Sequence, residues 1–207
     1  NIGHNALLDT EDGTSPHTIT AMISGDNAVN TDSLKLHYTT TNWDAGEELL
    51  MVSTGNVNEY SADIPATGTD MLVSYYIAVH DIDARFYTSP GEAPEYFNRF
   101  AVAVDTIKPV LLHQPLSIVF VNDPIAKIVA TVGDNMGTNP LIMTYKINDG
   151  VTTNIEIPVK ALDTDGYYSA EHYYEWDLGL LGVQKGDVVQ YQLSVTDIGS
   201  NANTAIH

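Results

Sequence analysis

An internal repeat constrains the fold more than any other feature of this chain. The pattern Val-x-Tyr-x-(Ile/Leu)-x-Val-x-Asp occurs at residues 73–81 and again at residues 189–197. Three shorter matches precede it in the same order in both halves: residues 19–27 with 128–135, 34–39 with 141–146, and 60–62 with 168–170. A series of matches in one order indicates one structural unit used twice. We therefore expect two similar domains, residues 1–105 and 106–207, each near the usual domain size of about 100 residues.

Each half has the pattern of short β-strands. At 75–79 and 189–195 the apolar members fall on one face of an extended strand. Turn signals recur at short intervals and leave little room for helices: Asp12-Gly13, Thr67-Gly68, Asp149-Gly150, Asp165-Gly166 and Gly186-Asp187. One helical turn is expected between Asp177 and Val183, where two glycines oppose a longer helix. The sequence predicts an all-β protein of two tandem antiparallel β-sandwiches. Residues 104–109 form the expected join, which Pro109 stiffens.

Composition limits the classes of partner. The chain has 27 acidic against 8 Lys and Arg residues, a formal net charge of −19. This charge repels nucleic-acid backbones and anionic membranes, and it attracts cations. The absence of cysteine removes disulfides, thiolate metal sites and cysteine nucleophiles. No apolar run approaches the ~20 residues of a membrane helix. We expect neither nucleic-acid binding nor membrane insertion.

The order of these elements resembles the immunoglobulin-like or fibronectin type III-like modules found in tandem in secreted and surface proteins of bacteria and archaea. The residues that carry the resemblance are the repeated pattern ending at Asp81 and Asp197, the Asp-Ile-Gly-Ser-Asn turn at 197–201, and the Asp-Thr-x-x-Pro join at 105–109. The first copy departs from it, because residues 81–85 contain no glycine. The resemblance implies an extracellular or cell-surface location and roles as spacer, adhesion or glycan-binding module. Residues 1–4 contain neither an initiator Met nor a signal-peptide core, so we expect a segment of a longer precursor.

Several aspartates are expected to gather at one pole of each sandwich. If the matched segments are strands B, C, E and F of an immunoglobulin-like sandwich, the loops after B and F share one pole. Carboxylates, amides and carbonyls supply the 6–8 oxygens that Ca²⁺ takes in typical sites. The candidate ligands are Asp26, Asp81 and Asp83 in the first copy, and Asp105, Asp134, Asp197 and Asn201 near the join. Alternatively, these side chains cap turns without a metal. The Asp-Thr-Asp-Gly segment at 163–166 lacks the Glu of a calcium loop and is expected to be a turn.

Aromatic residues offer a second kind of candidate site. Alternation at 167–176 places Tyr168, His172, Tyr174 and Trp176 on the core face, and it places Tyr167 and Tyr173 outward with Glu171 and Glu175. Tyr167, Tyr173 and Trp43 are candidates to stack on a sugar or a protein partner. Alternatively, they form cross-strand pairs that stabilise the sheet without a ligand.

Motifs for catalysis are missing from the sequence. The seven histidines form no His-Glu-x-x-His element, and neither a Gly-x-Ser-x-Gly elbow nor a phosphate-binding loop occurs. We expect a non-catalytic, extended acidic spacer or adhesion module, with no required cofactor and with calcium at its seam as the candidate stiffening ion. Its expected partners are other domains of the parent chain. The alternatives are a carbohydrate- or protein-binding accessory module of a secreted hydrolase, which would bind polysaccharide or a surface protein, and an enzyme domain that uses scattered carboxylates or histidines.

Overall fold

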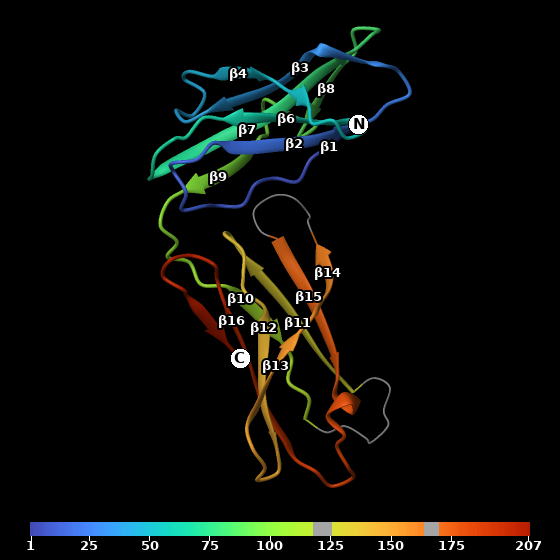
Figure 1. Ribbon diagram of the computed structural model, residues 1–207, viewed down its shortest axis with the longest axis vertical. Coiled ribbons are helices and arrows are strands. Elements are labelled where there is room, and N and C mark those ends of the chain that lie inside the picture. Colours follow the sequence, from blue (N-terminus) through green and yellow to red (C-terminus); the bar gives the residue numbers. More distant parts are fainter. Residues whose placement is uncertain (118–125, 164–169) are drawn as a thin grey trace. The chain divides into compact units, whose positions relative to one another are not determined.

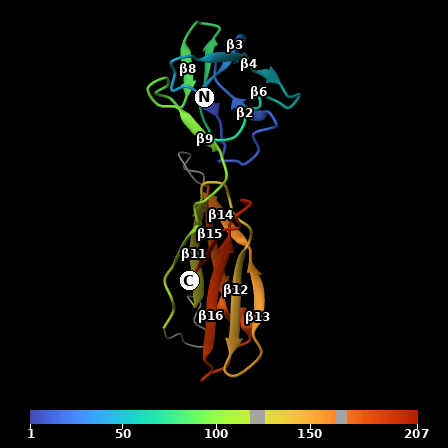
Figure 2. The same cartoon turned by 90° about the vertical axis from the view of Figure 1, so that its left-hand side faces the viewer.

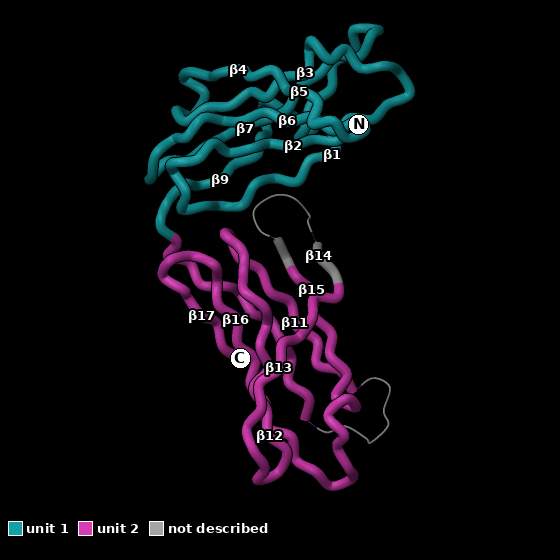
Figure 3. The backbone as a smooth tube through the Cα atoms, in the orientation of Figure 1, with its two compact units in different colours: residues 1–104, 166–168 teal, residues 105–165, 169–207 magenta. Residues whose placement is uncertain are grey.

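The computed structural model describes residues 1–117, 126–163 and 170–207, and it confirms an all-β protein with antiparallel sheets. Two compact units divide the chain between Val104 and Asp105 (Figure 3). We call residues 1–104 unit 1 and the described residues from 105 onward unit 2. The division lies one residue before the expected boundary, because Asp105 is bonded within unit 2. The amide of Asn201 donates to its carbonyl oxygen at 2.7 Å.

Unit 1 contains two antiparallel sheets (Figure 1). One has the order β1 (Ile2–Gly3), β2 (His17–Ile23), β6 (Glu59–Ile64) and β5 (Val52–Ser53). The other has the order β4 (Glu47–Leu50), β3 (Val29–Thr39), β7 (Met71–Asp81) and β8 (Phe86–Ser89). A further strand, β9 (Asn98–Val102), pairs with the first half of β7, whereas β8 pairs with its second half. The edge beside β7 is therefore divided between two short strands, which the sequence did not predict.

Unit 2 repeats this plan. One sheet has the order β10 (Val110–His113), β11 (Lys127–Asp134), β15 (Ala170–Asp177) and β14 (Val159–Asp163). The other has the order β13 (Thr153–Ile157), β12 (Leu141–Ile147), β16 (Val189–Thr196) and β17 (Thr204–Ile206). Figure 2 shows β12, β13 and β16 side by side, as their pairing requires. The expected helical turn is the 3₁₀ helix η1 (Leu178–Leu181), which ends at Gly182 with φ 69°. No helix in the described ranges is long and apolar enough to cross a membrane.

Each unit buries its own apolar core between its sheets. In β7 the alternate residues Val73, Tyr75, Ile77 and Val79 are at most 3 % exposed. In β16 the matching positions Leu193 and Val195 are at most 1 % exposed, and Tyr191 packs against the same core. The period of two that the sequence shows in these segments is thus confirmed as the inward face of a strand.

A histidine–tyrosine contact ties the start of each unit to one of its core strands, β7 in unit 1 and β16 in unit 2. In unit 1 the Nδ1 of His4 lies 2.8 Å from the carbonyl oxygen of Thr20, so this nitrogen carries the proton and donates. Its Nε2 then accepts from the hydroxyl of Tyr75 at 2.8 Å, and that hydroxyl accepts from the backbone N–H of Leu7 at 3.0 Å. This pattern corresponds to the neutral imidazole, the form that burial favours by lowering the pKa of His4.

The same contact occurs in unit 2. His113 lies 2.8 Å from both the carbonyl oxygen of Val129 and the hydroxyl of Tyr191. The N–H of Leu116 donates to that hydroxyl at 3.3 Å. The histidines look scattered in the sequence, and these contacts were not predicted because the bonded residues lie more than 70 positions apart.

Replacing Tyr75 by Phe should destabilise unit 1 by about 1–3 kcal/mol, because the buried N–H of Leu7 and Nε2 of His4 lose their partner. The chain has two tryptophans, Trp43 in unit 1 and Trp176 in unit 2, so fluorescence of Trp176→Phe and Trp43→Phe backgrounds follows each unit separately in urea. Tyr191→Phe is the matched change for unit 2. Unchanged midpoints for Tyr75→Phe would show that the contact contributes nothing.

Unit 1 should also lose stability as the pH falls from 7 towards 5. Burial lowers the pKa of His4 below its ordinary value of 6.5, although the bond to Thr20 opposes this. A base with a depressed folded-state pKa contributes stability that is present above the unfolded pKa and is lost as the pH falls towards the folded pKa. In urea titrations at several pH values, His4→Gln should reduce the slope to the part due to His37, whose pKa burial also lowers. An unaltered slope would contradict the assignment.

Candidate cation site in unit 2

Three aspartates meet where strands of the two sheets of unit 2 end. Asp134 is the last residue of β11, Asp197 directly follows β16, and Asp105 precedes β10. One carboxylate oxygen of each lies within 4.8 Å of the other two. The three residues are only 3 %, 4 % and 1 % exposed for Asp105, Asp134 and Asp197. The predicted gathering of these three residues at one pole is therefore present in the structure.

One oxygen of each carboxylate caps a turn. Oδ1 of Asp134 accepts from the N–H groups of Met136 and Gly137, both at 2.9 Å. Oδ1 of Asp197 accepts from Gly199 and Asn203, both at 3.1 Å. Turn capping, the alternative that the sequence left open, thus accounts for one of the two oxygens, Oδ1, of each carboxylate.

The third carboxylate is held in a similar way. Oδ1 of Asp105 accepts from the N–H of Ile107 at 2.9 Å. The capping bonds fix the orientation of all three carboxylates. They do not involve Oδ2 of Asp134 or Oδ2 of Asp197.

Those second oxygens are buried and have no hydrogen-bond donor. Oδ2 of Asp134 and Oδ2 of Asp197 have no partner among the described residues. All 8 Lys and Arg and all 7 His side chains lie in the described ranges. The ion pairs that they form involve Glu48, Asp81, Asp83 and Glu175, and none reaches Asp134 or Asp197. Burying carboxylate charge without a compensating partner is costly.

The electrostatics of the site favour uptake of a positive charge. Burial raises the pKa of Asp134, and the neighbouring carboxylates of Asp105 and Asp197 raise it further against its two backbone hydrogen bonds. A proton or a cation would relieve this repulsion. Carboxylate oxygens are ligands that Ca²⁺ prefers, at 2.3–2.6 Å. Oxygens that share one such ion lie at most about 5 Å apart, and the spacing within this group satisfies that limit.

Two other residues position Asp105. Asn201, predicted as a ligand, donates through its amide nitrogen to the carbonyl oxygen of Asp105. Nδ2 of Asn203, a residue that the sequence did not indicate, lies 3.4 Å from the same oxygen. Both come from the loop after β16, so this loop holds the first residue of unit 2. Only the Asp-x-Gly-x-Asn turn pattern gave a signal for this loop in the sequence.

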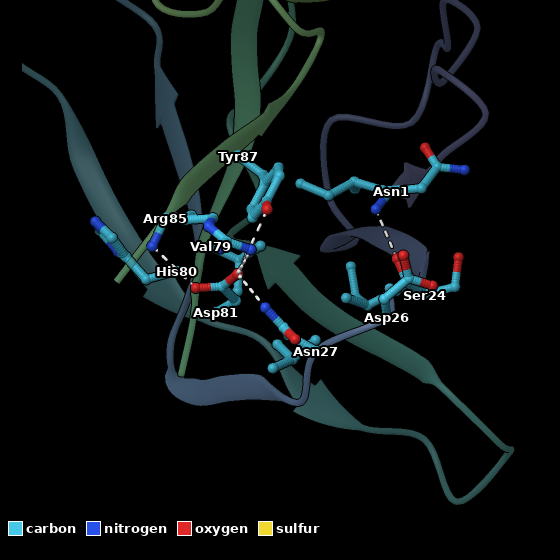
Figure 4. A pocket seen from close by; sticks show the side chains of 13 residues that line it. Asn1, Ser24, Asp26, Asn27, Val79, His80, Asp81, Arg85 and Tyr87 are labelled. Carbon is cyan, nitrogen blue, oxygen red and sulfur yellow. Dashed lines mark hydrogen bonds and ion pairs between the residues drawn. The ribbon is translucent and has the colours of Figure 1, made fainter. Parts of the chain in front are cut away.

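The aspartates predicted for the first copy do not form such a group. Within unit 1, Asp81 is 7 % exposed, whereas Asp26 and Asp83 are exposed. Asp26 and Asp81 line a pocket of about 230 Å³ (Figure 4). There Oδ2 of Asp81 has partners: Nδ2 of Asn27 at 3.3 Å, the hydroxyl of Tyr87 at 3.4 Å and the guanidinium of Arg85 at 3.8 Å.

These contacts lower the pKa of Asp81, whereas the pKa of Asp134 in unit 2 is raised. Burial opposes ionisation of Asp81, but the N–H of Arg85, the amide of Asn27 and the N–H of Asp83 bond to its carboxylate, and the charge of Arg85 adds to them. Together they lower its pKa. In unit 1 this carboxylate is therefore compensated by the chain itself.

Two of the three predicted aromatic residues, Trp43 and Tyr173, are packed and partly buried. Trp43 is partly buried against Tyr76 and Phe97, with ring centroids 5.3 and 5.5 Å apart. Tyr173 is partly buried beside Glu175, which pairs with Lys127 and Lys160. Tyr167 and the turn at residues 164–166 lie outside the described residues. The packing interpretation therefore fits Trp43 and Tyr173 better than the ligand-binding one.

Comparison with known proteins assigns no family. No protein-family model matches the sequence, and no curated protein matches it.

Replacing Gly199 by Ala should disturb the group formed by Asp105, Asp134 and Asp197 and destabilise unit 2. A β-carbon at Gly199 would lie 2.9 Å from the Cβ and 3.3 Å from Oδ2 of Asp105, so Asp105 must move. Overpacking of this kind typically costs about 1–3 kcal/mol. Urea unfolding followed by Trp176 should show a lower midpoint for Gly199→Ala than for the parent protein. Equal midpoints would mean that Asp105 is not held as described.

Proposed function

We propose that this chain is a non-catalytic tandem segment of a larger exported protein, in which two immunoglobulin-like units act as an acidic spacer or adhesion module. Unit 2 binds one calcium ion through Asp105, Asp134 and Asp197. The ion holds the residue that joins the units and so stiffens the join. Its partners are the other domains of the parent chain.

The strand order of each unit supports the immunoglobulin-like assignment. In that fold the first, second, fifth and fourth strands form one sheet, and the third, sixth and seventh form the other. In unit 2 the corresponding orders are β10-β11-β15-β14 and β13-β12-β16-β17, with β13 as an additional edge strand. Unit 1 has the same arrangement in β1-β2-β6-β5 and β4-β3-β7-β8.

The buried Oδ2 atoms of Asp134 and Asp197 are the observation that carries the calcium proposal. They lie beside Asp105 and have neither a donor nor a basic side chain among the described residues. A protonated carboxyl would also lower the charge, but it would need an acceptor for its proton and would leave the other oxygens facing one another. One divalent cation satisfies all three carboxylates together.

The position of Asp105 connects the ion to a mechanical role. Asp105 is the first residue of unit 2 and directly follows Val104, the last of unit 1. An ion shared with Asp134 and Asp197 would fix Asp105 to the loops after β11 and β16. The backbone at Asp105, where the chain enters unit 2, then loses conformational freedom. This restraint is what a spacer requires.

Calcium should raise the stability of unit 2. A ligand at 100 times its dissociation constant stabilises the folded state by about 2.7 kcal/mol. In the Trp43→Phe background, the urea midpoint followed by Trp176 should rise with calcium and return with chelator. Asp197→Asn should abolish this response and should stabilise the chelated protein, because one repelling charge is removed.

The exposed Asp26→Asn change in unit 1 is the control and should keep the calcium response. Identical unfolding curves of the parent protein with calcium and with chelator would refute the calcium site.

A further inference from the structure

The loops that follow β11 and β16 are bonded to each other as well as to their own aspartates. The backbone N–H of Asn139 donates to the carbonyl oxygen of Thr196 at 2.8 Å, and the N–H of Ile198 donates to that of Gly137 at 3.1 Å. An antiparallel bridge between the loops includes Asp197 itself. The two loops that carry the aspartates therefore form a short ladder.

The side chain of Asn139 adds a bond that reaches one of the proposed ligand residues. Its Nδ2 donates to the carbonyl oxygen of Asp197 at 2.8 Å. On the other loop, Oδ1 of Asp134 caps the turn that leads to Asn139, by accepting from the N–H groups of Met136 and Gly137. The separation between the carboxylates of Asp134 and Asp197 is thus set by two paired backbone segments.

We propose that Asn139 is a positioning residue for ion selectivity: by holding the two loops at a fixed separation, it makes the site accept calcium and reject magnesium. The inference rests on the calcium site proposed above and concerns the choice of ion at that site. Asn139 acts through the backbone of Asp197 and not as a ligand.

Calcium and magnesium differ in the distance at which they bind oxygen. Calcium takes its oxygens at about 2.3–2.6 Å in flexible geometries, whereas magnesium requires a nearly octahedral shell at about 2.0–2.1 Å. Magnesium therefore needs carboxylates that can move closer together. The paired loops resist this movement, because it would break the bonds that Asn139 and Ile198 make across the ladder.

Burial adds a second barrier to magnesium. Asp105, Asp134 and Asp197 are at most 4 % exposed, and the Oδ2 atoms of Asp134 and Asp197 are buried. An ion among such groups must give up most of its hydration shell. Magnesium dehydrates reluctantly and usually keeps several water molecules in protein sites. The same burial is therefore less favourable for magnesium than for calcium.

Removal of the Asn139 side chain should loosen the ladder without disrupting the fold. Asn139 is exposed, so its truncation to alanine leaves no buried cavity. Its backbone N–H, which donates to Thr196, is retained in the variant. Because loss of a bond that orients a ligand residue lowers metal affinity, Asn139→Ala should bind calcium about tenfold more weakly. It should also distinguish less between calcium and magnesium.

Asn148 provides a matched control at the opposite end of β16. It also joins two loops of unit 2: its Nδ2 donates to Oδ1 of Asp187 at 2.8 Å, and its Oδ1 accepts from the N–H of Val188 at 2.9 Å. Asn148→Ala should lower the urea midpoint of unit 2, followed by Trp176. It should keep the calcium affinity and the ion selectivity of the parent protein.

Calorimetry of the whole chain tests the inference. Calcium chloride and magnesium chloride are titrated separately into the parent, Asn139→Ala and Asn148→Ala, and calcium chloride is titrated again in millimolar magnesium chloride. The parent should bind one calcium ion, with an affinity that magnesium barely reduces. In Asn139→Ala the ratio of the magnesium to the calcium dissociation constant should fall, and magnesium should compete more strongly.

Equal affinities of the parent for calcium and magnesium would overturn the inference and leave the calcium site standing. Asn139→Ala with the calcium affinity or the selectivity of the parent would also overturn it, as would the same losses in Asn148→Ala. A parent protein that binds neither ion would refute the proposed site itself, and the inference with it.

Discussion

Negative charge held away from water is the constraint on which this account depends. Three carboxylates share one buried pole of unit 2, and two of their oxygens have no donor among the described residues. At the corresponding pole of unit 1, Arg85 reaches both Asp81 and Asp83. The two units have the same strand order and differ in how this charge is balanced. Because an unbalanced buried carboxylate is costly, the difference must have a consequence for stability.

The backbone around each pole explains why the carboxylates cannot simply turn away. In unit 2 the capped oxygens of Asp134 and Asp197 receive four N–H donors in total, two for each residue. Rotation of either side chain would break these bonds. The loop after β16 also binds the carbonyl oxygen of Asp105 through Asn201. Ligand geometry in this site is therefore set by turns between strands, and the strands are held by the cores and by the histidine–tyrosine contacts.

The fold and part of the cation site could be predicted from local patterns in the sequence. Strand alternation and turn signals predicted the all-β fold, and the repeat placed Asp134 and Asp197 at one pole. Contacts between side chains far apart in the sequence or set by the turn were missed: Arg85 beside Asp81 and Asp83, and His4 beside Tyr75. The sequence also did not predict that the amide nitrogen of Asn201 donates to the carbonyl oxygen of Asp105. Trp43 was expected at the surface, but the strands bring Tyr76 and Phe97 against it.

A crystal structure of the chain grown with calcium chloride tests the central claim most directly. Anomalous scattering at a long wavelength locates calcium independently of the protein atoms. We predict one calcium peak in unit 2, at about 2.3–2.6 Å from one carboxylate oxygen each of Asp105, Asp134 and Asp197. We predict no peak beside Arg85. A pole of unit 2 without a peak, with its carboxylates turned outward or paired with a basic side chain, would contradict it.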